Sequence, residues 1–369
     1  MAPSSTNKEA ITFRPSTPDD AGGIRQLLRG TPFGHRISLT LEPDPGHSPL
    51  PGDPGRDHTI VATRDSDPHT ILGLAERTGH RVWINRQPVR LGYLGQLRRQ
   101  PGEDITLRRL REGYTMLEAR RRDDELPFDY TSILADNTPA RRLLERGLPG
   151  LPRYQPAGTM TTLTLSTNRA RALPAPVDVR PLTPGHHDNA IECLHRHHCQ
   201  RQLAPHVDAT IFSLPGIEWF HTSRNDHTTG CLALWNQSAF KTIAVQGYAP
   251  WIHRFRQPIN LLRSLQGTPT LPPPGHRLPL AFLAFLAADD NAPDTIVSLI
   301  TAAAQTADQQ HLTHLCLGLP ADHPALPFLR KRLRPETTDS IIYLVHPANR
   351  PATTPLDTAH PIHPEIALL

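Results

Sequence analysis

The chain has 369 residues, enough for two domains that each bury a core, and its 39 Lys and Arg against 35 Asp and Glu make it only mildly basic. The basic residues are scattered with few aromatic residues among them, so no nucleic-acid-binding module is indicated. Four unevenly placed cysteines give no disulfide framework, and residues 1–10, expected to be flexible, lack the apolar stretch of a signal peptide. The longest apolar run, 278–288, is too short to span a bilayer. We therefore expect a cytoplasmic protein with no nucleic-acid or membrane partner, and its oligomeric state stays open.

The first half of the sequence predicts a mixed α/β unit. A strand over 11–14 precedes a helix that begins near Thr17 and runs to Leu28, with Pro18 suited to the first helical position. Residues 31–58 are rich in Pro, Gly and His and predict a long loop. Further strands are expected over 59–64, 70–78, 81–85, 89–97, 131–135 and 159–165, and further helices from Ile105 onward and over 138–146.

The second half predicts the same order of elements after a linker over 166–176. Strands are expected over 177–180, 231–236, 240–248, 280–287, 313–318 and 340–346, and helices over 186–203, 293–310 and 325–333. The Pro-rich segment 347–369 predicts a disordered tail, of which Ile366 to Leu369 could dock on the protein.

Two sequence echoes connect the halves. Residues 11–18 read Ile-Thr-Phe-Arg-Pro-Ser-Thr-Pro, and 177–184 read Val-Asp-Val-Arg-Pro-Leu-Thr-Pro. A second echo links 137–144 with 322–329 in the same order. Spacings of this size match a whole domain rather than a solenoid repeat, so we expect tandem copies of one fold over 11–165 and 177–346.

The first copy resembles the GNAT superfamily of acyl-CoA-dependent N-acyltransferases. Val89-Arg-Leu-Gly-Tyr-Leu-Gly-Gln-Leu-Arg-Arg-Gln-Pro101 is similar to the family's central strand and its exit. Asp136-Asn-Thr-Pro-Ala-Arg-Arg-Leu-Leu-Glu-Arg-Gly-Leu148 is similar to its N-x-x-A-x-x-L-Y-x-x-x-G-F signature, one residue shorter before the glycine. The second copy resembles the family only weakly. The resemblance implies an α/β protein of two tandem GNAT-like domains, each a mixed, mostly antiparallel sheet flanked by helices.

The resemblance also implies a cofactor site in the first copy. In the family, acyl-CoA lies in a gap beside the central strand, which here would place Leu97, Arg98 and Arg99 against the pantetheine. Gly102 matches the first glycine of the pyrophosphate loop at a helix N-terminus, and Asn137 matches a common cofactor contact. The sequence departs from the loop pattern after Gly102, where Glu103 and Asp104 bring negative charge and either oppose a pyrophosphate or cap the following helix.

Candidate catalytic residues are fewer. Glu76 lies on a strand where the family often carries its general base, or it is a solvent-facing carboxylate on an alternating strand. Leu144 occupies the position of the family's usual acid, a Tyr, so Tyr154, Tyr130 or Tyr114 could substitute for it. Tyr154 could equally make a structural hydrogen bond, and Tyr114 fits the core face of its helix.

Two other segments are expected to carry no cofactor. Ala287 to Pro293, the second copy's equivalent of the phosphate loop, has no Gly or Arg, so that copy is expected to be structural or to form a wall of the acceptor pocket. The segment Cys193-Leu-His195-Arg-His197-His-Cys199 places its i,i+4 pairs on different helix faces, so four ligands cannot converge and no metal site is expected.

The resemblance favours an N-acetyltransferase that moves the acetyl group of acetyl-CoA, or another acyl group from its CoA thioester, to an amine on a small molecule or peptide, with its active site in the first copy. The alternative is a non-catalytic GNAT-like module that senses a ligand or binds a protein, since the phosphate loops of both copies are degenerate.

Overall fold

A computed structural model describes residues 11–34, 36–43, 59–103, 106–350 and 356–369. Asp104 and most of the expected loop 31–58 lie outside these residues. The strands are β1 (Ile11–Pro15), β2 (Ile37–Pro43), β3 (Thr59–Arg64), β4 (Gly73–Ile84), β5 (Gln87–Arg99), β6 (Glu125–Leu134), β7 (Arg153–Ser166), β8 (Arg180–Pro181), β9 (Ile217–Arg224), β10 (His227–Trp235), β11 (Lys241–Tyr248), β12 (Leu280–Ala288), β13 (His314–Pro320) and β14 (Glu336–His346). The α-helices are α1 (Ala21–Gly30), α2 (Leu107–Glu118), α3 (Thr138–Leu144), α4 (Thr167–Arg171), α5 (His187–His198), α6 (Pro250–Leu265), α7 (Pro293–Gln309) and α8 (Leu326–Leu333).

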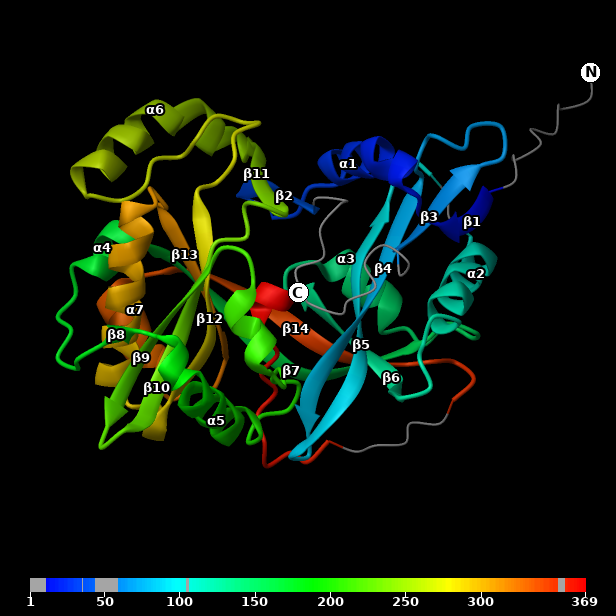
Figure 1. Cartoon of the computed structure of the whole chain (residues 1–369). Coiled ribbons are helices and arrows are strands. Elements are labelled where there is room, and N and C mark those ends of the chain that lie inside the picture. The colour runs from blue at the N-terminus through cyan, green and yellow to red at the C-terminus, as the bar shows by residue number, and fades with distance from the viewer. Residues whose placement is uncertain (1–10, 35, 44–58, 104–105, 351–355) are drawn as a thin grey trace, which may run out of the picture.

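One sheet runs through both halves of the chain, in the order β1-β3-β4-β5-β6-β14-β7-β13-β12-β10-β9-β8 (Figure 1). Its pairings are antiparallel except β5 with β6 and β12 with β13, which are the central pairs of the two halves. The helices flank this sheet. The expected mixed α/β class, with mostly antiparallel sheets flanked by helices, is therefore confirmed.

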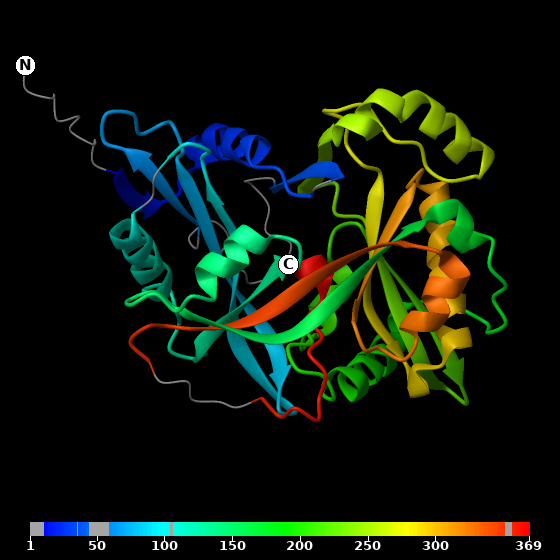
Figure 2. The same cartoon turned by 180° about the vertical axis from the view of Figure 1, so that it is seen from behind.

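The two halves exchange their last strands. The last strand of the first half, β7, pairs with β13 of the second, and the last strand of the second half, β14, pairs with β6 of the first. The exchanged strands also pair with each other over Glu336–His346 and Thr164–Arg153, and Figure 2 shows both crossing from one half to the other. The segment 336–346 therefore completes the sheet of the first half, so neither half has a complete sheet of its own.

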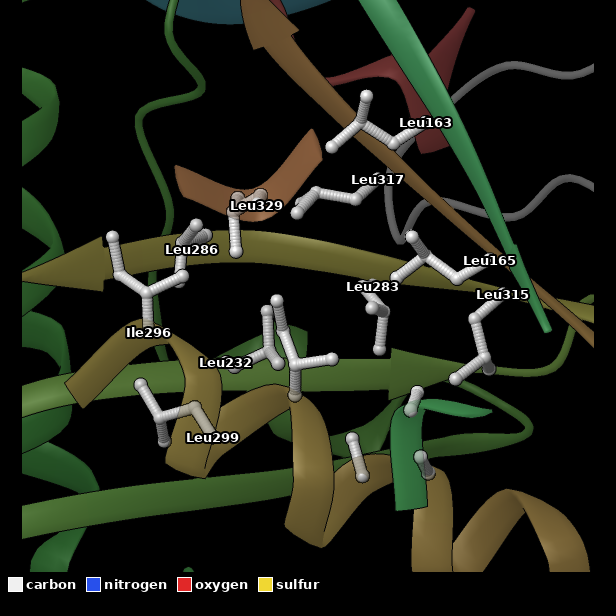
Figure 3. Close-up of a cluster of buried hydrophobic side chains, with 14 of the residues drawn as sticks. Leu163, Leu165, Leu232, Leu283, Leu286, Ile296, Leu299, Leu315, Leu317 and Leu329 are labelled. Carbon is white, nitrogen blue, oxygen red and sulfur yellow. The ribbon is translucent and has the colours of Figure 1, made fainter. Parts of the chain in front are cut away.

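The largest apolar core lies between the sheet and α7. Figure 3 shows leucines of β7, β10, β12 and β13 meeting Ile296 and Leu299 of α7 and Leu329 of α8. This core includes Leu163 and Leu165, so the first half's last strand packs inside the second half's core. Burial of these side chains therefore holds the exchanged strands in place.

Several local predictions are confirmed. The hairpin between β4 and β5 turns at Asn85 and Arg86, whose φ values of 49° and 65° fit a two-residue turn that follows the twist of the strands. Gly147, three residues after α3, has a φ of 61°, as a residue that ends a helix often does.

Other parts of the fold differ from the sequence prediction. The expected strands 70–78 and 81–85 form one long strand, β4. Part of the expected loop 31–58 is β2, which pairs with β11 and so links the halves. The helix α6 was missed because Pro258 lies inside it. Residues 356–369 of the expected tail pack on the protein, with the Gln202 amide donating to the Pro361 carbonyl (2.9 Å) and Ile362 against Gly158.

Candidate functional site

The central strands of the first half separate part-way along their length. The ladder between β5 and β6 ends at Tyr93 and Tyr130, although β5 continues to Arg99. The last link beyond it is the Thr131 hydroxyl, which donates to the Leu94 carbonyl (2.6 Å). On its other side β5 stays paired with β4 to the end. A gap between two central strands therefore opens where the sequence predicted the pantetheine site.

Backbone amides of β5 face this gap, and two of its polar side chains lack partners nearby. The Gln100 amide donates to Leu72 on the β4 side, so the alternation of a strand turns the amides of Leu97 and Arg99 toward β6. Gln96, with a φ of 50°, forms a bulge where β5 leaves β6. The buried Gln96 Oε1 and Arg98 Nε have no hydrogen-bond partner among the residues that the structure describes. Such atoms are costly unless a ligand or water satisfies them, which fits a site that binds a polar chain.

The expected phosphate loop combines features that favour anion binding with one acidic side chain that opposes it. Gly102 has a φ of 85°, and a Cβ added there would meet nothing within 4 Å, so the main chain is open to a ligand. The carboxylate of Glu103 is bound by Arg64 (2.5 Å), which offsets part of its repulsion of an anion. The helix α2 begins after its N-cap Thr106. Asn137 caps α3 by accepting from the Ala140 amide (3.4 Å) and is exposed.

Glu76 shares its surroundings with a buried cation. The carboxylate is close enough to Lys241 to favour that lysine's charged form, although burial is the larger effect and lowers the pKa of Lys241 to about 8. Lys241 Nζ also donates to the main-chain oxygen of Leu369 (3.0 Å) and lies over the ring of Phe282 (5.5 Å). Tyr93 joins the group, since burial and then the charge of Glu76 raise the pKa of its hydroxyl. Glu76 is thus half-buried at the junction of the two halves.

An aromatic wall adjoins this carboxylate. The ring of His80 stacks on Tyr93 (5.9 Å), and its Nδ1 hydrogen-bonds the Tyr130 hydroxyl (2.7 Å). Burial lowers the pKa of His80 to about 4, so the ring is neutral at pH 7. These residues fix the start of the gap by packing rather than by charge.

Tyr154 lies on the other face of the sheet. Its hydroxyl hydrogen-bonds that of Tyr114 (2.7 Å), and burial raises the pKa of Tyr114 to about 12. Tyr114 also lines a small apolar cavity beside Leu97 and Leu117. The tyrosine pair therefore reaches the gap from the α2 side, while Glu76 reaches it from the side of Lys241. Leu144 packs in the same apolar cluster as Tyr154.

The equivalent gap of the second half is filled by the protein itself. The ladder between β12 and β13 ends at Phe282 and Cys316. Beyond it, the Glu365 carboxylate accepts from the Phe285 amide (2.7 Å), and Ile366 packs so closely on Gly318 that a Cβ there would lie 2.4 Å from it. Figure 1 shows this end of the chain between the two halves. The chain's own segment occupies the place where a cofactor would pair with β12.

The segment that fills this gap brings a buried carboxyl with it. Burial raises the pKa of Glu365 from its ordinary 4.5 to about 7, despite the amides of Phe285 and Ala367 and the nearby guanidinium of Arg201. The folded carboxyl therefore holds its proton more tightly than the unfolded one, and stability is lost as the pH rises.

We expect the stability advantage of the wild type over Glu365→Gln to fall by up to about 3 kcal/mol between about pH 4.5 and 7. Chemical denaturation of both proteins across this range measures it. The neighbouring buried histidines, His198, His323 and His363, titrate in both proteins and cancel. A difference that stays constant from pH 4.5 to 8 would contradict a perturbed carboxyl.

The histidines and cysteine of α5 make hydrogen bonds with separate partners and do not converge on one point. His197 Nε2 pairs with Asp289 (2.8 Å), His195 Nε2 with the Val207 carbonyl (2.7 Å), and the pKa of Cys193 is lowered to about 6, mainly by its hydrogen bond with Cys231. Within the part of the chain that the structure describes, no three His, Cys, Asp or Glu side chains are grouped to hold a metal ion. No helix of the described ranges is long and apolar enough to cross a membrane.

Sequence reasoning missed Lys241 and Glu365. Lysine is rare in this arginine-rich sequence, which was a signal for Lys241, but its partners lie in the other half and at the end of the chain. Glu365 belongs to the segment predicted as tail, and nothing in its local sequence indicates burial.

Several solved structures have a similar fold. Saccharomyces cerevisiae N-myristoyltransferase with bound myristoyl-CoA matches with a TM-score of 0.56 and 11% identity, over 95% of this chain and 84% of that one. The same enzyme with myristoyl-CoA and inhibitors matches with a TM-score of 0.55 and 12% identity, over 96% and 84%. A GCN5-related N-acetyltransferase from Kribbella flavida aligns more loosely, with a TM-score of 0.45 and 12% identity, over 91% and 71%. The sequence itself matches no protein-family model and no curated protein. The structural matches show that this chain has a tandem GNAT-type fold.

Proposed function

We propose, from this tandem GNAT-type fold, that the protein is an N-acyltransferase that moves an acyl group from acyl-CoA to an amine on a small molecule or peptide. One observation carries the proposal and favours the first half as its site. The gap beside β5 leaves the amides of Leu97 and Arg99 without a strand partner, whereas the matching gap beside β12 is filled by Glu365 and Ile366.

Acyl-CoA would bind along the end of β5. The pantetheine amide pairs with the main chain over Leu97 to Arg99, and Arg98 Nε gains a partner that it lacks among the described residues. The pyrophosphate lies at Gly102, where the main chain is open and the N-terminus of α2 offers amides. Arg99 and Asn137 supply further polar contacts from the two sides.

Acyl transfer requires that a proton leave the acceptor amine and that another reach the leaving thiolate. Glu76 accepts a proton from the acceptor amine, whose nitrogen attacks the thioester carbonyl and forms the amide bond as the carbon–sulfur bond breaks. The leaving thiolate takes a proton from Tyr154, through the Tyr114 hydroxyl that is bonded to it. Burial raises the pKa of Tyr154, so its hydroxyl keeps its proton at neutral pH and has one to donate. Donation to a thiolate whose conjugate acid has a pKa of about 8.5 is uphill, so Tyr154 must then regain a proton from water while Glu76 releases one.

The acyl group is proposed to be acetyl. The solved N-myristoyltransferase structures hold myristoyl-CoA, whose acyl chain is much longer than acetyl. Binding of the short and the long acyl-CoA must therefore be compared directly. Calorimetry with acetyl-CoA and myristoyl-CoA does so, and release of free CoA over a panel of amines and peptides then identifies the acceptor.

We expect micromolar binding of acyl-CoA to the wild type and at least about tenfold weaker binding to an Arg99→Ala, Asn137→Ala double variant, since it loses two polar contacts to an anionic ligand. Calorimetry at low and moderate salt measures both. Arg171→Ala, an exposed arginine on α4, is the matched control and should bind as the wild type does. Absence of binding at millimolar concentrations of either CoA ester would favour the non-catalytic alternative.

A further inference from the structure

The helix α6 carries most of the protein's exposed large apolar side chains. Seven such side chains are exposed in the described residues, and the two outside α6 are Leu97 and Leu143. The five on α6 are Trp251 (56% exposed), Phe255 (51%), Leu261 (65%), Leu262 (58%) and Leu265 (78%). Together with Pro258, four of them recur at spacings of four, three, four and three residues, and they form one exposed apolar stripe that follows the helix through its kink at Phe255 (φ −104°, ψ 15°).

The helix is attached to the protein by its polar side. The Asn260 side chain exchanges two hydrogen bonds with the main chain of Leu271 (3.0 and 2.7 Å), and Arg263 donates to the Pro269 carbonyl (2.5 Å). Only Ile252 is a buried apolar anchor. The apolar stripe therefore points outward because specific contacts hold the opposite face, an arrangement inverse to that of an ordinary surface helix.

The charge around the stripe has one sign. The helix contains Arg254, Arg256 and Arg263 and no acidic residue, and the sequence has no Asp or Glu from 227 to 288. An anionic surface therefore matches this region. Glu336, which binds Arg263 (3.4 Å), is the nearest opposite charge that the structure records for the helix.

The position and length of the helix suit a flat surface. It lies across the outer end of the second half in both views (Figures 1 and 2). Its 16 residues extend about 24 Å, and Pro258 interrupts its hydrogen bonding, so it cannot span a bilayer. A basic helix with Trp, Phe and Leu on one face fits the interface between headgroups and acyl chains.

We propose that α6 docks this protein on an anionic lipid bilayer, with the stripe from Trp251 to Leu265 inserted among the headgroups and the exposed Arg254 beside it against the lipid phosphates. The inference is independent of the proposed acyl transfer. It departs from the sequence-based expectation of no membrane partner, because docking on a surface needs no spanning segment.

The test uses flotation of the full chain with vesicles of phosphatidylcholine alone or mixed with phosphatidylglycerol. We expect binding to the mixed vesicles, weakened by salt, with a blue shift of Trp251 emission that is lost in Trp251→Phe. A Leu262→Ser, Leu265→Ser double variant should bind at least about tenfold more weakly, because two inserted side chains are lost. Leu143→Ser, which removes an exposed leucine on α3, is the matched control and should bind as the wild type does.

Three results would overturn the proposal. They are no binding to phosphatidylglycerol vesicles at low salt, undiminished binding of the double variant, and a concentration-dependent dimer in sedimentation that the double variant abolishes. The last result would assign the stripe to a second copy of the chain. Thermal melting of each variant checks that the exposed substitutions leave the fold intact.

Discussion

Replacing Glu76 with Gln should lower kcat/KM for acyl transfer by about 10²- to 10⁴-fold while acyl-CoA binding stays near the wild-type value. The amide keeps the size of the side chain beside Lys241 but cannot accept the proton of the acceptor amine. The loss should appear in kcat as well as kcat/KM, because proton removal is part of the bond-forming step. Free-CoA release with the acceptor found in the screen measures it, and calorimetry measures the unchanged cofactor affinity.

Glu192→Gln is the matched control, because this exposed glutamate lies on α5 in the other half. It should leave the rate unchanged. A Glu76→Gln protein with wild-type kcat across the pH range would remove Glu76 as the base. The next group to test would be Lys241, whose pKa of about 8 makes it partly neutral in mildly alkaline solution.

Replacing Arg77 with Met should destabilise the protein by about 3–5 kcal/mol, the largest effect on stability that we expect from one substitution. The Arg77 side chain is fully buried and bonds the carboxylates of Glu125 (2.5 Å) and Asp129 (2.9 Å). Without it, two buried carboxylates lose their shared cation, although Asp129 keeps its ion pair with Arg121 (2.9 Å). Urea unfolding of the wild type and the variant measures the difference.

The matched comparison is Arg108→Ala, which breaks an ion pair with Glu112 but removes a side chain that is 85% exposed. It should cost no more than about 0.5 kcal/mol. Adding Glu125→Gln and Asp129→Asn to Arg77→Met should recover part of the loss, because the uncompensated charges then disappear. Equal effects of Arg77→Met and Arg108→Ala would mean that the buried cluster contributes no more than a surface pair.

The same cluster explains a glycine in the sequence motif. A Cβ at Gly92 would lie 2.2 Å from Asp129 Oδ1 and 2.4 Å from an Arg77 nitrogen. The ion pair therefore crosses β5 directly over Gly92. The resemblance identified this glycine as part of the central strand, and the structure gives the local reason for it.

The sequence by itself determined the local features of this protein, namely its turns, several strands and the position of the central strand. The hairpin at Asn85 and Arg86 follows from a turn between two alternating runs, and the strands β3 and β12 follow from their apolar patterns. The central strand and the position of the gap near Leu97 were predicted from the motif around Gly92. Glu76 was placed on its strand correctly by alternation, although its neighbours were not known.

What only the tertiary structure decided depends on contacts between distant segments. The exchange of β7 and β14 depends on which strands they pair with, and no local signal in either sequence shows which sheet each one joins. Lys241 meets Glu76 because β11 pairs with β2 across the halves, and Glu365 reaches the second gap because the chain returns between the halves after β14. Their burial, and with it their pKa values, comes from segments far away in the sequence, which residue patterns within a short window cannot record.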